Sequence, residues 1–210
     1  MGQERNIYMR INPKIYHIAD DVEPLNRYEY EDGRVVEVFI MDNFEDVYNE
    51  FTGQSKFSVW SSEDGQNYRL FVESGNYDVL KDLYGSKVNL IWIDFWDKCE
   101  EISNGYSKKL IMPLTLVCVA IYFIGVSVFQ WDLWICILLL VTFVGVLSFI
   151  NKLSKKKIAD ANYESIAKIK SAIGEKHFQN LLEIQRAYPD DFYERKYPST
   201  FDDEEENKEE

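Results

Sequence analysis

Histidine and cysteine are scarce in this chain, with two histidines and three cysteines among 210 residues. The cysteines, Cys99, Cys118 and Cys136, include no C-x-x-C pair, so neither a disulfide framework nor a zinc site of the usual spacing is expected. The sequence also lacks the G-x-S-x-G, H-E-x-x-H, G-x-x-x-x-G-K-S/T and G-x-G-x-x-G motifs. We therefore predict a protein that is not an enzyme and that holds no metal and no cofactor.

A few polar groupings could still imitate a site. His17 precedes two aspartates by three and four residues, which is more typical of a solvated acidic turn than of a metal cluster. His177 falls on an amphipathic segment, where a packed histidine is more common than an acid–base catalyst. Asp94 and Asp97 form a carboxylate pair that could do acid–base chemistry, but we favour a role in keeping a strand end near the bilayer hydrated.

Charge is absent from two long stretches, Leu110–Phe129 and Leu133–Ile150, which contain 20 and 18 residues and are joined by Gln130-Trp131-Asp132. A helix crosses the roughly 30 Å bilayer core with about 20 apolar residues, and spanning segments must satisfy their own backbone hydrogen bonds. The pattern therefore predicts a transmembrane helical hairpin. A buried hairpin in a soluble protein is disfavoured because neither segment shows a polar face. The position, about a hundred residues into the chain, disfavours a secretory signal peptide.

The orientation of the hairpin follows from its flanking charges. The linker contributes Asp132 but no basic residue, and Trp131 and Trp134 fit an interfacial aromatic belt. The flanking basic residues, which we expect at the membrane surface, are Lys108, Lys109, Lys152, Lys155, Lys156 and Lys157. The positive-inside rule then predicts a two-span membrane protein with both termini in the cytoplasm.

Small and weakly polar residues recur at helical spacing in both apolar segments. They are Thr115, Cys118, Tyr122 and Gly125 in the first segment, and Thr142, Gly145 and Ser148 in the second. Close packing of membrane helices favours such residues, so we predict that these two faces meet within the hairpin. A pore-lining role is the alternative, but neither segment carries an ionisable residue at mid-depth, as ion pathways usually do.

The Gln130-Trp131-Asp132-Leu133 linker, between two membrane helices, is similar to the start of the W-D-I/L-M-E-P signature of mitochondrial calcium uniporter pore subunits. The resemblance implies a channel whose glutamates form a calcium-selective ring. Here Ile135 replaces that glutamate and Cys136 replaces the proline. The calcium site is therefore not expected in this chain.

Residues 1–107 predict an acidic cytosolic α+β domain with a ββαββαβ-like order and a largely antiparallel sheet. Asp32-Gly33 and Glu63-Asp64-Gly65 mark two hairpins. The predicted strands are Asn6–Ile11, Lys14–Ala19, Arg27–Glu31, Val35–Met41, Lys56–Ser61, Tyr68–Glu73 and Lys87–Phe95, and the predicted helices are Asn43–Phe51, Asn76–Tyr84 and Asp97–Ser107.

After the hairpin (108–152), residues 153–188 predict one cytosolic amphipathic helix, with its pattern clearest over Ser154–Ala187. Its apolar stripe, a predicted interaction surface, consists of Ile166, Ile169, Ile173, His177, Leu181, Ile184 and Tyr188. Gly174 lies inside this stripe and could weaken or bend the helix. The stripe could cover the chain's own N-terminal domain, a second copy or another protein. Residues 189–210 form an aromatic and acidic tail, whose last residues are expected to be disordered.

The net charge is −13, and residues 1–107 contain 21 acidic and 10 basic residues. This excess disfavours nucleic acid as a partner because the phosphate backbone would be repelled. The expected partners are the lipid bilayer and either a protein or a second copy. We predict a non-catalytic scaffold, assembly or regulatory subunit of a membrane complex. A small oligomeric channel or transporter and a membrane-tethered enzyme remain alternatives.

Overall fold

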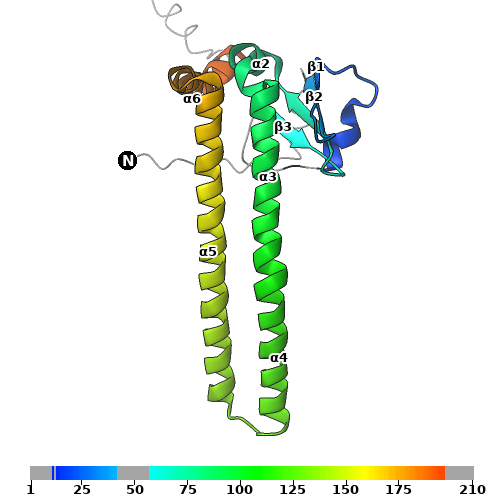
Figure 1. Cartoon of the computed structure of the whole chain (residues 1–210). Coiled ribbons are helices and arrows are strands. Elements are labelled where there is room, and N and C mark those ends of the chain that lie inside the picture. Colours follow the sequence, from blue (N-terminus) through cyan, green and yellow to red (C-terminus); the bar gives the residue numbers. More distant parts are fainter. Residues whose placement is uncertain (1–10, 12, 42–56, 197–210) are drawn as a thin grey trace, which may run out of the picture. The chain divides into compact units, whose positions relative to one another are not determined.

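The computed structural model describes residue 11, residues 13–41 and residues 57–196. The chain divides into two compact units (Figure 1). One unit contains the residues up to Asn89 together with those from Lys170 onward, and the other is Leu90–Ile169. Of the predicted elements, the helix Asn43–Phe51 and all of the strand Asn6–Ile11 except Ile11 lie outside the described residues.

The first unit contains a four-stranded mixed sheet in the order β1-β2-β4-β3. Its strands are β1 (Asn26–Glu29), β2 (Val35–Ile40), β3 (Ser58–Ser61) and β4 (Asn67–Val72). Both predicted hairpins form, since β1 pairs antiparallel with β2 and β3 pairs antiparallel with β4. The central pair, β2 and β4, is parallel. The structure thus supports an α+β domain, in which two of the three strand pairs are antiparallel and the central pair is parallel.

The turns of both hairpins depend on glycine. Gly33 and Gly65 have φ angles of +86° and +69°, a region that side chains with a Cβ rarely adopt. Between the strands, the rings of Phe39 and Phe71 stack with centroids 5.5 Å apart. These rings belong to a buried cluster with Ile15, Ala19 and Val59.

Pro13–Ala19 forms a 3₁₀ helix (η1), so the strand predicted over Lys14–Ala19 is wrong. Proline suits the first turn of a helix because its missing N–H needs no partner there. Ile15 and Ala19, four residues apart, are both buried. The alternation of polar and apolar residues in this segment was too short to distinguish the two-residue period of a strand from the period of a helix.

The predicted helix Asn76–Tyr84 is confirmed as α2 (Ser74–Leu80) followed by the short η2 (Lys81–Tyr84). Glu73 caps α2, because its carboxylate accepts the N–H of Asn76. Gly85 then ends the segment with an extended backbone.

Ser86–Tyr106 forms the 21-residue helix α3, so the strand predicted over Lys87–Phe95 is wrong. The helix expected over Asp97–Ser107 is its second half. Buried and half-buried positions recur every three or four residues, at Val88, Trp92, Phe95, Cys99 and Ile102. That period belongs to a helix, and a nine-residue apolar run was not long enough to reveal it.

One turn of π-helix, η3 (Ser107–Ile111), joins α3 to α4 (Met112–Ser127). The N–H of Met112 donates to the carbonyl of Ser107, five residues earlier. Pro113, at the start of α4, has no N–H to continue the ordinary ladder. We attribute the wider turn to this proline.

The helix α5 (Leu133–Ile173) contains 41 residues and is about 60 Å long at 1.5 Å per residue. Gly174, with φ of +91°, ends it, and α6 (Glu175–Lys196) follows. The single helix predicted over Ser154–Ala187 is therefore wrong. Glycine in the left-handed region terminates helices, and the apolar stripe continues across the break.

Candidate functional site

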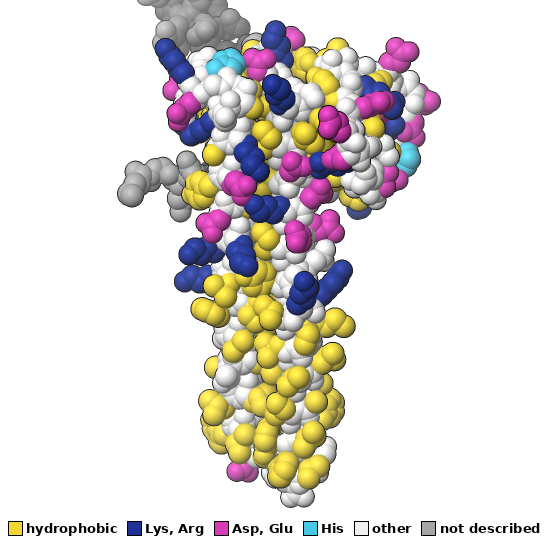
Figure 2. Space-filling view, in the orientation of Figure 1, with side chains coloured by type: hydrophobic (Ala, Val, Ile, Leu, Met, Phe, Trp, Pro, Cys, Tyr) yellow, Lys and Arg dark blue, Asp and Glu magenta, His cyan; other side chains and the backbone are white. Residues whose placement is uncertain are grey.

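Two helical segments, Ser86–Ser127 and Leu133–Ile173, are long and apolar enough to cross a membrane. In their most apolar 18-residue stretches only 6% and 0% of the residues are buried. A core helix of a soluble protein would be mostly buried, so the low burial of these stretches suggests a membrane location. Figure 2 shows the hydrophobic side chains gathered over α4 and the adjacent part of α5. We call α4 with residues 133–150 the apolar helix pair.

The turn at the end of the apolar helix pair is closed by Trp131. The backbone N–H of Trp131 donates to the carbonyl of Gly125 at 3.1 Å, and Gln130 adopts a positive φ of 49°. A Cβ added to Gly125 would overlap the Trp131 ring. Gly125 therefore makes room for the Trp131 ring at the turn. Its prediction as a helix-packing residue did not suggest this role. The conformation of the turn, which helical spacing does not reveal, brings the ring back over the glycine.

The contact faces of the apolar helix pair differ from the predicted seam on one side. On α4, Thr115 and Cys118 are half-buried beside Leu114, while Tyr122 is 43% exposed. In residues 133–150 of α5, the half-buried residues are Cys136, Leu139, Phe143, Leu147 and Ile150, whereas Thr142, Gly145 and Ser148 are exposed. A Cβ on Gly145 would meet no atom within 4 Å. Helical spacing identified residues that share a face, but it did not determine which face meets the neighbour.

The hydroxyls of this region bond within their own helices. Thr115 Oγ1 donates to the carbonyl of Ile111 and Thr142 Oγ1 to that of Leu138, each at 2.8 Å. These bonds satisfy two polar groups that hydrocarbon would leave without a partner. They stabilise single helices and do not join the two.

All six lysines predicted at the membrane surface are exposed. We call them the lysine cluster: Lys108, Lys109, Lys152, Lys155, Lys156 and Lys157. Figure 2 shows dark-blue side chains along one border of the yellow hydrophobic region. Lys157 Nζ lies 5.3 Å from the centroid of the Tyr106 ring, a cation–π contact. Lys108 and Lys109 lie within η3, and the other four lysines follow the apolar part of α5.

Beyond the lysine cluster, the two helices continue as a polar helix pair, residues 90–106 of α3 and 158–169 of α5. Phe95, Cys99 and Ala161 form its buried cluster. Lys98 Nζ lies 2.5 Å from Glu164 Oε2 across the pair. Hydrogen bonding to Lys98 lowers the pKa of Glu164 to about 2. Burial raises the pKa of the Cys99 thiol to about 11, so this cysteine is a packing residue.

In the first unit, α6 is joined to α2 by Tyr188, whose hydroxyl donates to Glu73 Oε2 at 2.5 Å. The same oxygen accepts the N–H of Asn76 at 2.7 Å. The Asn76 side chain accepts in turn from Tyr84, whose pKa is raised by burial. A Cβ on Gly75 would overlap the Tyr188 hydroxyl. Sequence reasoning placed Tyr188 in the stripe but gave no signal for its bond to Glu73, 115 residues away.

The predicted interaction stripe is divided between α5 and α6, with unequal exposure. Ile169, Leu181 and Tyr188 are buried; Ile166, Ile173 and Ile184 are half-buried; His177 is exposed. Tyr188 also contacts Phe57, their ring centroids 4.9 Å apart. Most of the stripe is thus covered within the chain itself, and His177 is the member left open.

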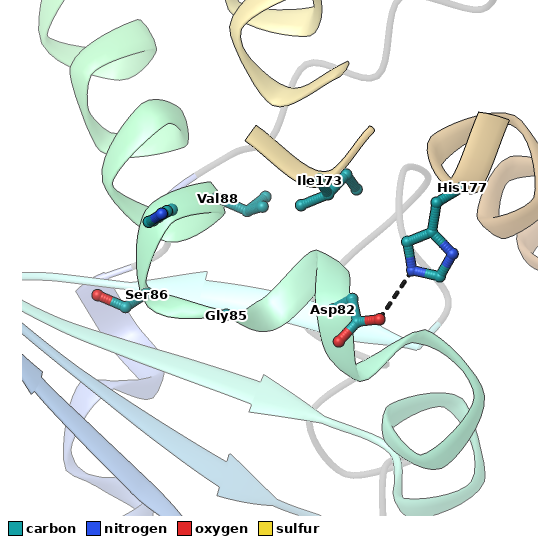
Figure 3. Close-up of a pocket in the computed structure, with 7 residues that line it drawn as sticks. Asp82, Gly85, Ser86, Val88, Ile173 and His177 are labelled. Atoms are coloured by element: carbon teal, nitrogen blue, oxygen red, sulfur yellow. Dashed lines mark hydrogen bonds and ion pairs between the residues drawn. The ribbon is translucent and has the colours of Figure 1, made fainter. Parts of the chain in front are cut away.

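A shallow pocket of about 390 Å³ in the first unit is lined by Asp82, Gly85, Ser86, Lys87, Val88, Ile173 and His177. His177 Nε2 lies 2.8 Å from Asp82 Oδ2. Figure 3 shows His177 directed toward Asp82 and Ser86 on the opposite side, directed away. The pocket therefore contains no serine activated by this histidine.

No grouping of three or more metal-ligating side chains occurs in the part of the chain that the structure describes. The chain matches no protein-family model, no curated protein and no solved structure. Function must therefore be argued from this chain's own surfaces. The most distinctive of these is the exposed apolar helix pair bordered by lysines.

Proposed function

We propose that this protein is a two-span integral membrane protein whose hairpin anchors a cytosolic α+β domain. In this proposal it acts as a non-catalytic scaffold or regulatory subunit of a membrane complex. The observation that carries it is the exposure of the apolar helix pair, because residues such as Leu133 and Trp134, 73% and 78% exposed, need an apolar solvent. The lysine cluster supports an orientation with both termini in the cytoplasm.

The scaffold role is supported by how the protein's mass and charge are distributed. On the side of the hairpin with the turn, the linker of residues 130–132 leaves almost no surface for a partner. The other side carries the domain rich in acidic residues. We propose that a basic surface of another membrane-associated protein binds there, since complementary charge favours encounter and register.

Topology is tested by cysteine labelling in intact cells. The native residues Cys99, Cys118 and Cys136 are replaced by alanine, and a single cysteine is introduced as Asp132→Cys or as Ser171→Cys, both exposed positions. An impermeant maleimide should label the Asp132→Cys variant in intact cells and the Ser171→Cys variant only after permeabilisation. The reverse pattern would contradict the proposed orientation.

The scaffold role is tested by crosslinking in intact membranes followed by purification of the full chain in detergent. We expect one or more other proteins at fixed stoichiometry, and their recovery should fall when the salt concentration is raised before crosslinking, because the contact is electrostatic. Recovery of this chain alone would contradict the scaffold role and leave the membrane anchor standing.

A further inference from the structure

The lysine cluster contains positive charge that the described residues around it do not neutralise. Between residues 102 and 159 the sequence contains these six lysines and a single acidic residue, Asp132, which lies in the linker. Within the described part of the chain, no carboxylate forms an ion pair with any of the six. Six uncompensated charges at one level of a helix pair are unusual in a protein whose net charge is −13.

In the neighbouring polar helix pair, by contrast, lysines form ion pairs with a glutamate. In the polar helix pair, Lys98 bonds to Glu164, and Lys168 Nζ lies 3.0 Å from Glu164 Oε1. Lysines there have acidic partners within reach. The contrast indicates that the lysine cluster takes its negative charge from outside the protein.

The position of the lysine cluster identifies the kind of ligand. It borders the exposed apolar residues, whose solvent under the proposed function is the lipid hydrocarbon. Groups at that level are the phosphates of the lipid headgroups, and juxtamembrane sets of about four to eight basic residues attract anionic lipids. Lysine side chains can also extend along apolar surface to place their ammonium groups at the phosphates.

We propose that the lysine cluster binds the phosphate groups of anionic phospholipids and holds a layer of these lipids around the hairpin. The proposal rests on the proposed function, because it requires the hairpin to span a bilayer. It adds the chemical class of the lipid. It also explains how an acidic chain stays close to an anionic leaflet, since the attraction is confined to one level of the helix pair.

The test uses the full chain reconstituted into vesicles of phosphatidylcholine with 30% phosphatidylglycerol. Spin-labelled phosphatidylglycerol and spin-labelled phosphatidylcholine are compared by the motionally restricted fraction of each. The wild type should prefer the anionic lipid by about fivefold in relative association constant. Retention in the vesicle pellet after carbonate washing is measured on the same samples.

Two variants with the same change in net charge separate the lysine cluster from bulk charge. In one, all six lysines of the cluster are replaced by glutamine. In the other, six lysines elsewhere are replaced by glutamine: Lys14, Lys81, Lys87, Lys168, Lys170 and Lys176. The first variant should lose the preference while remaining in the pellet, and the second should keep it.

Several outcomes would overturn the proposal. Equal restriction of both lipids by the wild type, or equal loss of preference in both variants, would exclude a specific anionic-lipid site. A preference that emerges only after residues 202–210 are deleted would show that this acidic segment occupies the lysines instead. Each of these results leaves the membrane anchor intact. Release of the wild type by carbonate would instead contradict the proposed function itself.

Discussion

The apolar and polar helix pairs are parts of the same two helical segments, yet they are held together by different contacts. In the polar pair, Phe95, Cys99 and Ala161 are 2%, 8% and 3% exposed, and charged residues cover the outside. In the apolar pair the contact residues are only half-buried, and the outside is apolar. Water drives burial in the first case. In the second, under the proposed function, the surrounding lipid would be as apolar as the helices, so packing and the turn would have to hold them together.

The largest expected effect comes from emptying the core of the polar pair. Phe95→Ala should lower the free energy of unfolding by about 3–5 kcal/mol, because it removes a fully buried ring. Phe143→Ala, in the half-buried contact of the apolar pair, should cost clearly less. Thermal unfolding of the purified protein in one detergent measures both. Equal losses would show that the two contacts are alike.

Introducing a lysine should impair membrane insertion in the apolar pair but not in the polar pair, if the two pairs lie in different solvents. Val141 in the apolar pair and Tyr163 in the polar pair are both 59% exposed. Val141→Lys should disfavour insertion by about 2.5–3.5 kcal/mol, the cost of a charge near the centre of a membrane helix. Tyr163→Lys should leave the carbonate-resistant fraction unchanged. If the two variants insert equally well, residue 141 does not lie in hydrocarbon.

Two glycines test whether the apolar pair depends on its turn or on its seam. Gly125→Leu should destabilise the hairpin by about 1–3 kcal/mol, because the new side chain must displace the Trp131 ring. Gly145→Leu should have little effect, since the space around its Cβ position is empty. Thermal unfolding in detergent ranks the two. Greater damage from Gly145→Leu would restore the predicted small-residue seam.

The smallest expected effect concerns the ion pair between Lys98 and Glu164. The pKa of Glu164 is lowered to about 2 in the folded chain, so its contribution to stability is present above its ordinary pKa and disappears as pH falls through about 2. The wild type should be slightly more stable than Glu164→Gln at pH 7, because exposed ion pairs contribute little. The melting temperatures of the wild type and of Glu164→Gln should converge as pH is lowered from 7 to 2. A difference in melting temperature that grows toward low pH would contradict a stabilising ion pair between Lys98 and Glu164.

These comparisons also show which features could be predicted from the sequence. Both β-hairpins and the two apolar segments were visible because glycine turns and uncharged runs are local signals. The assignment of Lys87–Phe95 failed because a short apolar run suits a strand and a buried helix equally. The half of the seam at Thr142, Gly145 and Ser148 failed because residue spacing leaves the direction of a helix face undetermined.

Contacts between distant residues were beyond sequence reasoning. Nothing near Glu73 indicates that Tyr188 will bond to it, and nothing near Gly125 indicates that Trp131 will fold back over it. Such pairings depend on where the chain returns in space. The lysine cluster was different, because its six members lie within a few residues of the apolar segments and needed only the hairpin to bring them to one level.

The π-turn at Ser107–Ile111 has a consequence for helical phase. Half-buried positions step by three or four along α3 up to Tyr106, then by five to Ile111, and by three or four again to Leu114 and Cys118. An uninterrupted α-helix would present a different side of α4, rotated by about 100°, the angle of one residue. One additional residue thus lets α3 and α4 keep the same side toward α5 where the polar part of the helix gives way to the apolar part. Deleting one residue of the turn should instead give an uninterrupted α-helix that presents the same side of α4, because Tyr106 and Ile111 would then lie four residues apart.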